Sequence, residues 1–174
     1  MTFIPDFKPP SKEPTTALWF IYDRGRLLVK IRKDSCTIPE TSDLKPYQSA
    51  LIRKQYLGTL DGCPCYAAEI AGDRQAGMDL ESRDLRALFG KLDENLIWIA
   101  GRANQLVNWN QTHLYCGRCG QLTENMTDVG AKICPHCGLS SYPRLSPAIS
   151  VAVLQDGDSV RGRGRRGHLA CYGG

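Results

Sequence analysis

The sequence contains no apolar run long enough to span a membrane, and its N-terminus does not resemble a secretory signal. A membrane-spanning helix needs about 20 consecutive apolar residues, and a signal peptide needs a basic start followed by an apolar core. Residues 1–16 offer neither and contain four prolines (Pro5, Pro9, Pro10 and Pro14). We therefore expect a cytoplasmic protein with no membrane partner, and a poorly ordered leader over residues 1–16.

Acidic side chains are absent from the end of the chain, where the last glutamate is Glu124 and the last acid is Asp158. Excess positive charge is absent from residues 1–158. Four of the 22 Lys and Arg residues stand at 161, 163, 165 and 166, and the other 18 are balanced by 18 acids. Because all the excess charge lies in this tail, the body itself does not have the composition of a nucleic-acid-binding surface.

The eight cysteines do not form an obvious disulfide framework, which fits a reducing compartment. Four of them stand in two Cys-x2-Cys pairs, and the other four are Cys36, Cys63, Cys65 and Cys171. Cys63 and Cys65 would share one face of a strand. Without a Cys-x-x-Cys spacing, we interpret them as half-buried side chains rather than a redox pair.

The two pairs are Cys116-Gly117-Arg118-Cys119 and Cys134-Pro135-His136-Cys137. Two such turns can offer four thiolates in a tetrahedron, which is typical of a structural zinc site closed to water and substrate. The glycine after each pair, Gly120 or Gly138, suits a turn that needs positive φ. An iron site of the rubredoxin type and two disulfides are the alternatives. His113 lies three residues before the first pair, and we interpret it as a linker residue rather than a fifth ligand.

Two β-hairpins are predicted in the first half of the chain. One joins residues 18–22 to residues 27–31 through a turn at Gly25, and the other joins residues 53–60 to residues 63–70 through Asp61-Gly62. Pro64 lacks a backbone N–H, so it places its strand at a sheet edge.

Helical periodicity begins after residue 82. Ser82 is the expected N-cap of a helix that starts at residue 83, and Asp93 the expected N-cap of a longer helix that leads into the cysteines. Residues 121–133 should form a hairpin with a turn near 128–130. Residues 148–154 read as a strand, and the chain then turns at residues 155–158 before the Gly/Arg-rich segment.

An ordered set of features resembles the zinc-containing NADH pyrophosphatases (NAD diphosphatases) of the Nudix hydrolase superfamily, from about residue 17 to residue 158. The set comprises Ala100-Gly101-Arg102-Ala103, Trp109, His113, the two cysteine pairs, Tyr142-Pro143-Arg144, Pro147 and the strand at residues 148–154. The resemblance implies an α+β fold. A Nudix-like N-terminal domain of β-hairpins plus two helices (17–112) would precede a zinc ribbon (113–143), the first strand of an incomplete Nudix domain (144–160) and a Gly/Arg-rich tail (161–174).

The resemblance also implies a function. The family hydrolyses NAD(H) to AMP and the nicotinamide mononucleotide with Mg²⁺ or Mn²⁺, acts as a homodimer, and in some members removes NAD caps from RNA. The zinc ligands would be Cys116, Cys119, Cys134 and Cys137. Tyr142 would contact substrate, or else pack between the ribbon and the sheet, and Arg86 falls near a substrate-contacting arginine of the family.

One feature of the family is missing. The Nudix box, G-x5-E-x7-R-E-U-x-E-E-x-G-U, supplies the glutamates that bind the catalytic cations, and nothing like it occurs here. We expect a truncated or frame-shifted gene product that is inactive alone. The other hypotheses are a zinc-ribbon module whose Arg-rich tail binds RNA, and a protein-interaction fragment that pairs with an intact paralogue.

Overall fold

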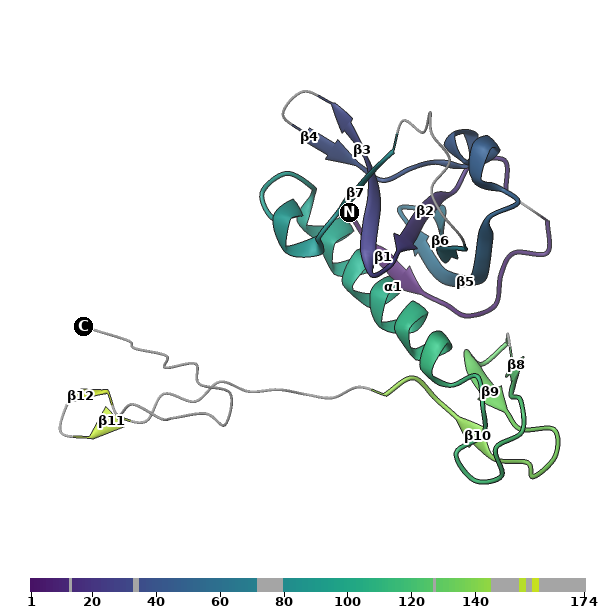
Figure 1. Cartoon of the computed structure of the whole chain (residues 1–174). Helices are drawn as coiled ribbons and strands as arrows, with labels where there is room; N and C mark the ends of the chain where they lie inside the picture. The colour runs from purple at the N-terminus through teal and green to yellow at the C-terminus, as the bar shows by residue number, and fades with distance from the viewer. Residues whose placement is uncertain are drawn as a thin grey trace. The chain divides into compact units, whose positions relative to one another are not determined.

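The computed structural model describes residues 1–12, 14–32, 35–71, 80–126 and 128–144, and the backbone of two short strands beyond them (Figure 1). The chain divides into two compact units, Met1–Arg144 and Leu145–Gly174. In the second unit, β11 (Leu154–Gln155) pairs antiparallel with β12 (Asp158–Ser159). The predicted strand at 148–154 lies outside the described residues except for its last position, as does the tail at 161–174.

Both predicted hairpins are present. β2 (Leu18–Asp23) turns into β3 (Arg26–Arg32) through Arg24 and Gly25, whose φ angles are 51° and 80°. β5 (Leu51–Leu60) turns into β6 (Cys63–Ile70) through Asp61 and Gly62, with φ angles of 47° and 81°. Two successive positive φ angles define the turn that matches the twist of a two-residue hairpin.

The two hairpins join into one sheet of order β1-β5-β6-β2-β3-β4, with β7 paired to β3. β2 and β6 run parallel at its centre. The prediction that Pro64 places its strand at an edge is therefore wrong. Pro64 pairs with Thr59 next to the closing pair Leu60–Cys63, so its nitrogen points away from β5 in the alternating antiparallel ladder. On the other side, the pairing with β2 begins only at Cys65, so no ladder bond is lost.

The leader predicted to be poorly ordered contains a strand, which corrects that prediction. β1 (Phe3–Pro5) pairs antiparallel with β5 and forms the outer edge of the sheet. Its partner Gly58 has a φ of 126°, and a Cβ there would lie 2.0 Å from the carbonyl oxygen of Ile4. Only glycine lets the two backbones come this close, so the sequence of β5 provides the place where the leader docks.

Short elements complete the sheet domain. They are β4 (Ser35–Thr37), the 3-10 helix η1 (Thr41–Tyr47), β7 (Glu81–Arg83) and the 3-10 helix η2 (Leu85–Leu88). Ser82 is therefore a strand residue, and its predicted role as a helix N-cap is wrong; the helical turn begins after Asp84. The strand forms because residues 81–83 find a free edge of β3, a long-range pairing that local periodicity does not reveal.

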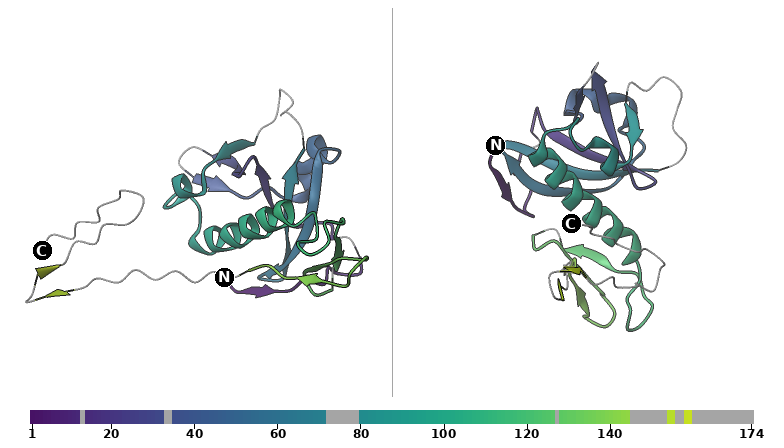
Figure 2. Two further views of the ribbon diagram at one scale, coloured as in Figure 1. Left: turned by 60° about the horizontal axis from the view of Figure 1, so that its bottom comes forward. Right: turned by 90° about the vertical axis from the view of Figure 1, so that its left-hand side faces the viewer.

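The long helix α1 (Glu94–Thr112) begins as predicted, because the Asp93 side chain accepts a hydrogen bond from the backbone N–H of Asn95. It packs along the sheet across β6, β2 and β5 (Figures 1 and 2). Alternate residues of β2 point to opposite faces, so Phe20 and Tyr22 join the core under α1 while Ile21 joins a second core. The Tyr22 hydroxyl donates to the carbonyl oxygen of Ala100 at 2.6 Å.

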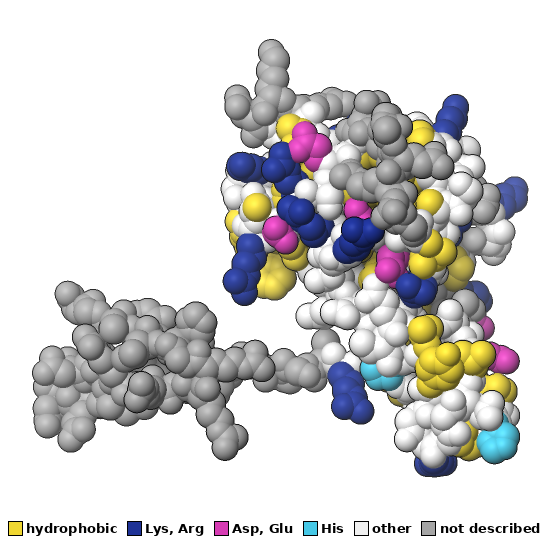
Figure 3. All heavy atoms as spheres, viewed as in Figure 1, with side chains coloured by type: hydrophobic (Ala, Val, Ile, Leu, Met, Phe, Trp, Pro, Cys, Tyr) yellow, Lys and Arg dark blue, Asp and Glu magenta, His cyan; other side chains and the backbone are white. Residues whose placement is uncertain are grey.

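The α+β fold class is thus confirmed, with hairpins, helical segments and a four-cysteine module in the predicted order. Cys65 is fully buried in the core under α1 and Cys63 is half-buried, as the structural interpretation of these residues requires. Within the part of the chain that the structure describes, no helix has the length and apolar character needed to cross a membrane. Acidic and basic side chains are mixed over the visible face of the sheet domain (Figure 3).

Candidate metal centre

Two loops of the same geometry carry the four cysteines. In the first, the backbone N–H of Gly120 donates to the carbonyl of Cys116 at 2.9 Å, and in the second Gly138 donates to Cys134 at 2.9 Å. Gly120 and Gly138 have φ angles of 75° and 70°, which confirms the predicted left-handed turn positions. The predicted hairpin between the loops is also present as β8 (Glu124–Met126) and β9 (Ala131–Ile133), and β10 (Ser140–Ser141) pairs with β9.

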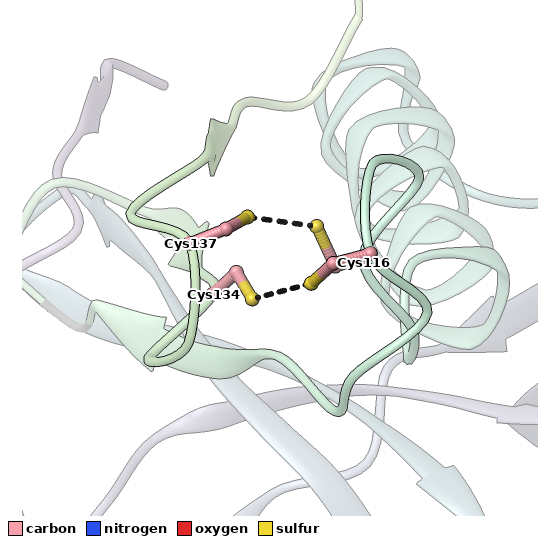
Figure 4. Close-up of side chains that lie close together, drawn as sticks. Cys116, Cys134 and Cys137 are labelled. Carbon is pink, nitrogen blue, oxygen red and sulfur yellow. Dashed lines mark hydrogen bonds between the residues drawn. The ribbon is translucent and has the colours of Figure 1, made fainter.

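The hairpin brings all four sulfurs into one group, with every sulfur within 4.8 Å of the others. Sγ of Cys116 lies 3.5 Å from Sγ of Cys137, and Sγ of Cys119 lies 3.4 Å from Sγ of Cys134. Figure 4 shows the sulfurs converging from the two loops. A tetrahedral zinc ion with Zn–S bonds of about 2.3 Å would separate its sulfurs by about 3.8 Å. The donor set and its spacing therefore fit a zinc ion held by thiolates.

Backbone donors favour the ionised form of two of these thiols. The N–H groups of Arg118 and Cys119 lower the pKa of Cys116 to about 6. The backbone N–H of Cys137 lowers the pKa of Cys134 against the opposing effect of burial. Because only the thiolate binds a metal ion, these backbone donors prepare Cys116 and Cys134 for coordination before an ion arrives. Four protein ligands complete a tetrahedron and would leave no position for water or substrate.

The segment between α1 and the first loop is fixed by hydrogen bonds. His113 lies at the C-terminal cap of α1, where its Nδ1 is 3.0 Å from the carbonyl oxygen of Trp109. The Thr123 hydroxyl donates to the carbonyl of His113 at 2.6 Å. The imidazole thus contacts the last turn of α1 and does not belong to the group of four sulfurs.

A buried lysine joins the ribbon to the helix. Lys132 in β9 is 4 % exposed, and its Nζ donates to the carbonyl oxygen of Asn110 at 3.3 Å. The same ammonium group lies 5.8 Å from the centre of the Trp109 ring. The sequence gives no sign of this contact, because a single lysine in a short polar strand normally points to solvent.

The structure does not bring the two predicted substrate residues together. Arg86 is exposed in η2, which contacts α1 and immediately precedes it in the chain. Tyr142 follows β10 in the ribbon, which meets the other end of α1 (Figure 1). A helix of 19 residues is about 28 Å long, so the two side chains do not share one site within the chain. Tyr142 is 58 % exposed, against the alternative that it packs between ribbon and sheet.

A cavity that the sequence did not reveal lies beside the ribbon. It has a volume of about 590 Å³. Its walls come from Phe7, Pro9 and Pro14 of the leader, and from β2, η1, β5, β6, the C-terminal end of α1 and the β8–β9 hairpin. These residues stand far apart in the chain, with no motif that links them, so only the folded arrangement shows that they meet.

Comparison with known proteins gives one family and a consistent set of relatives. Residues 16–109 match the family model of the NADH pyrophosphatase-like rudimentary NUDIX domain. The chain is 36 % identical over 151 residues to an NAD-capped RNA hydrolase NudC of Deinococcus radiodurans. This match covers 87 % of this chain and 50 % of the relative. It is 32 % identical over 129 residues to the NudC of Stutzerimonas stutzeri, covering 71 % of this chain and 44 % of the relative. The chain therefore spans about half the length of the curated relatives it matches.

Proposed function

Because this chain belongs to the NADH pyrophosphatase-like family of the Nudix superfamily, we propose that residues 17–143 are the non-catalytic part of an NAD(H) diphosphatase. The observation that carries the proposal is the closed group of four sulfurs directly after the family's rudimentary domain. In this proposal Cys116, Cys119, Cys134 and Cys137 hold Zn²⁺ as four thiolates. The ion supplies a cross-link between the two loops, which are too poor in large apolar side chains to fold by burial alone.

The proposed reaction of the whole protein is hydrolysis of the pyrophosphate in NAD(H), giving AMP and the nicotinamide mononucleotide. The relatives are named NAD-capped RNA hydrolases. These names support NAD-capped RNA as a second substrate, cleaved at the same pyrophosphate bond. We also propose, from the family resemblance, a homodimer in the cytoplasm. Sedimentation at micromolar concentration tests the assembly state, and a monomer would contradict the dimer.

We propose that the 174-residue chain by itself contributes to dimerisation and to part of the substrate pocket but does not catalyse hydrolysis. Family enzymes use Mg²⁺ or Mn²⁺ held by the glutamates of the Nudix box, and the sequence contains no such box. Tyr142 and Arg86 remain proposed substrate contacts. Since one chain does not bring them together, any shared site for them requires a second chain.

Hydrolysis is tested with protein made in a host that lacks its own NADH pyrophosphatase. The chain is incubated with NADH or with NAD-capped RNA, in Mg²⁺ or Mn²⁺, beside a full-length family enzyme as positive control. We expect no release of AMP above the background of a mock purification. Metal-dependent release of AMP from either substrate would show that the chain contains catalytic ligands that we have not identified.

A second candidate role is RNA binding by the arginines at 161, 163, 165 and 166, which lie outside the described residues. The names of the relatives favour it. Four arginines release at most about four counterions from a single strand, so log K should fall with log salt with a slope no steeper than about −3. Replacing the four arginines by serine should abolish this binding. Sub-micromolar affinity at physiological salt would make RNA binding the main function.

A further inference from the structure

The cavity beside the ribbon is a candidate ligand site. Its volume of about 590 Å³ falls in the range of small-molecule sites, and its described lining includes no cysteine and no acidic side chain. It is also separate from the four sulfurs. The nature of its walls therefore determines what it can bind.

Five aromatic side chains line the cavity: Phe7, Trp19, Tyr56, Tyr66 and Trp109. Trp19 and Tyr66 stack with their ring centres 4.8 Å apart and 17° between their planes, and Tyr56 lies 5.2 Å from Tyr66. The indole of Trp19 is held in place, because its Nε1 donates to the Thr41 hydroxyl at 3.2 Å. Such fixed ring faces suit a flat aromatic ligand, since stacking needs a planar partner.

Side-chain amides supply the polar part of the lining, from Gln48, Gln55, Asn110 and Asn125. Asn110 donates to Oε1 of Gln55 at 2.8 Å. Asn110 is 6 % exposed. The indole Nε1 of Trp109, which also lines the cavity, is buried and donates to no acceptor among the residues that the structure describes. A buried polar group without a partner is costly, so a ligand acceptor that reaches the Trp109 indole N–H would be favoured. Amides that combine a donor and an acceptor match the edge of a nucleobase.

The charge of the site is positive. Lys54 is the one charged side chain among the described lining residues, and it is exposed. Lys132 lies behind the wall that Asn110 and Trp109 form, and no carboxylate in the described parts of the chain pairs with it. A neutral sugar or an alkyl chain would not use this charge, whereas a phosphate group would.

We propose that this cavity binds one nucleotide, with the base against the Trp19–Tyr66 pair and hydrogen-bonded to Asn110, and the phosphate near Lys54. Such a site requires no catalytic carboxylate, so it goes beyond the proposed function and does not depend on it. Free AMP and a nucleotide within an RNA strand present the same chemistry. The test therefore includes both.

The three tryptophans make the test specific. Trp19 and Trp109 line the cavity, whereas Trp98 in α1 is 73 % exposed and lies 11 residues from Trp109, about 17 Å along the helix. The zinc-loaded chain is labelled with ¹⁵N, and its indole N–H signals are followed by NMR at constant ionic strength, with W98F to assign the third signal. The probes are AMP, a five-nucleotide oligoadenylate with a 5′-phosphate, and inorganic phosphate.

We expect AMP to shift the Trp19 and Trp109 signals saturably and to leave the Trp98 signal in place. Phosphate alone should shift none of them. Binding of the oligoadenylate at least tenfold tighter than AMP identifies RNA as the source of the nucleotide, and equal affinities identify the free nucleotide. In either case an absence of hydrolysis does not affect the result.

Two variants locate the ligand. Lys54→Gln removes the exposed charge and should weaken AMP binding about fivefold, while the matched variant Lys45→Gln, on an exposed residue of η1 that does not line the cavity, should not. Trp19→Leu should weaken binding by about tenfold, because stacking on one aromatic ring contributes about 1–3 kcal/mol. The proposal would be overturned if AMP caused no saturable shift up to about 10 mM while all three indole signals stayed dispersed as in folded protein. Equal effects of the two lysine variants would overturn it as well.

Discussion

The ammonium group of Lys132 donates a hydrogen bond to the main-chain carbonyl of Asn110 across the junction between the ribbon and helix α1. Asn110 lies in the last turn of α1, where carbonyl groups have no partner within the helix. A cation at this end also interacts favourably with the helix dipole. Lys132 therefore caps the helix from another module of the same unit.

Replacing Lys132 by methionine keeps the apolar stem and removes the cap. We expect the free energy of unfolding at pH 7 to fall by about 1 kcal/mol, because the Asn110 carbonyl loses its donor. Urea denaturation of the zinc-loaded protein measures it, with the exposed Lys91→Met as the control. Equal stability of the K132M variant and the parent chain would contradict the capping role.

The stability difference between K132M and the parent chain should depend on pH. Burial of the ammonium group, followed by the charge of Arg53, lowers the pKa of Lys132 below its ordinary value of 10.5. Between the folded and unfolded pKa values the unfolded chain binds more protons, so the contribution of Lys132 to stability rises with pH. The deficit of K132M should therefore be larger at pH 10 than at pH 7. A deficit that shrinks would show that the charge, and not its burial, dominates.

Purified protein should contain about one zinc per chain, because four thiolates saturate a tetrahedral site. Elemental analysis measures the metal, and iron in its place would give the coloured protein expected of a rubredoxin-type site. Removing the metal with a strong chelator should unfold the ribbon. Ribbon signals that persist unchanged in the chelator would contradict a structural metal.

Replacing Cys134 by serine should unfold the ribbon and leave the sheet domain folded, since the first two hairpins and α1 have their own core. Amide hydrogen exchange distinguishes the two regions. The control is Cys63→Ser, a half-buried cysteine outside the sulfur group, which should leave ribbon protection unchanged. Loss of protection throughout residues 17–112 in C134S would mean that the sheet domain depends on the metal.

We predict that alanine cannot replace Gly130 without loss of stability. It has a φ of 60°, and a Cβ there would lie 2.2 Å from the Phe7 ring. Gly130→Ala should destabilise the protein by about 1–3 kcal/mol through backbone strain and the displaced ring. Gly117→Ala is the control, because nothing lies within 4 Å of its Cβ position. Adding Phe7→Ala to Gly130→Ala should recover the part of the loss that comes from the ring.

Local chemistry in the sequence is sufficient for some parts of the fold. The turns at Gly25 and Gly62, the cap at Asp93 and the two cysteine loops are each determined by a few neighbouring residues, and each is present as predicted. The errors involve pairing over long distances. β1 and β7 pair with strand residues that lie more than about 50 positions away along the chain, and a local pattern contains no record of such partners.

Pro64 is a second example in which a local property of the sequence does not determine the structural outcome. Its missing N–H is a local fact, but its consequence depends on which neighbour faces that nitrogen. The cavity is an extreme case, since its walls come from the leader and from seven helices and strands. No sequence signal could have assembled them.

The cavity walls belong partly to the sheet and partly to the β8–β9 hairpin of the ribbon, which contributes Asn125, Met126, Gly130 and Ala131. A ligand held by both walls and an ion held by the cysteines then favour the same folded hairpin. Their binding free energies are reciprocal: whatever factor the ligand adds to zinc affinity, zinc adds to ligand affinity. If the proposed zinc and the proposed nucleotide both bind, a chain that loses its metal should hold the nucleotide more weakly, and the occupancy of the cavity would then report on the supply of zinc.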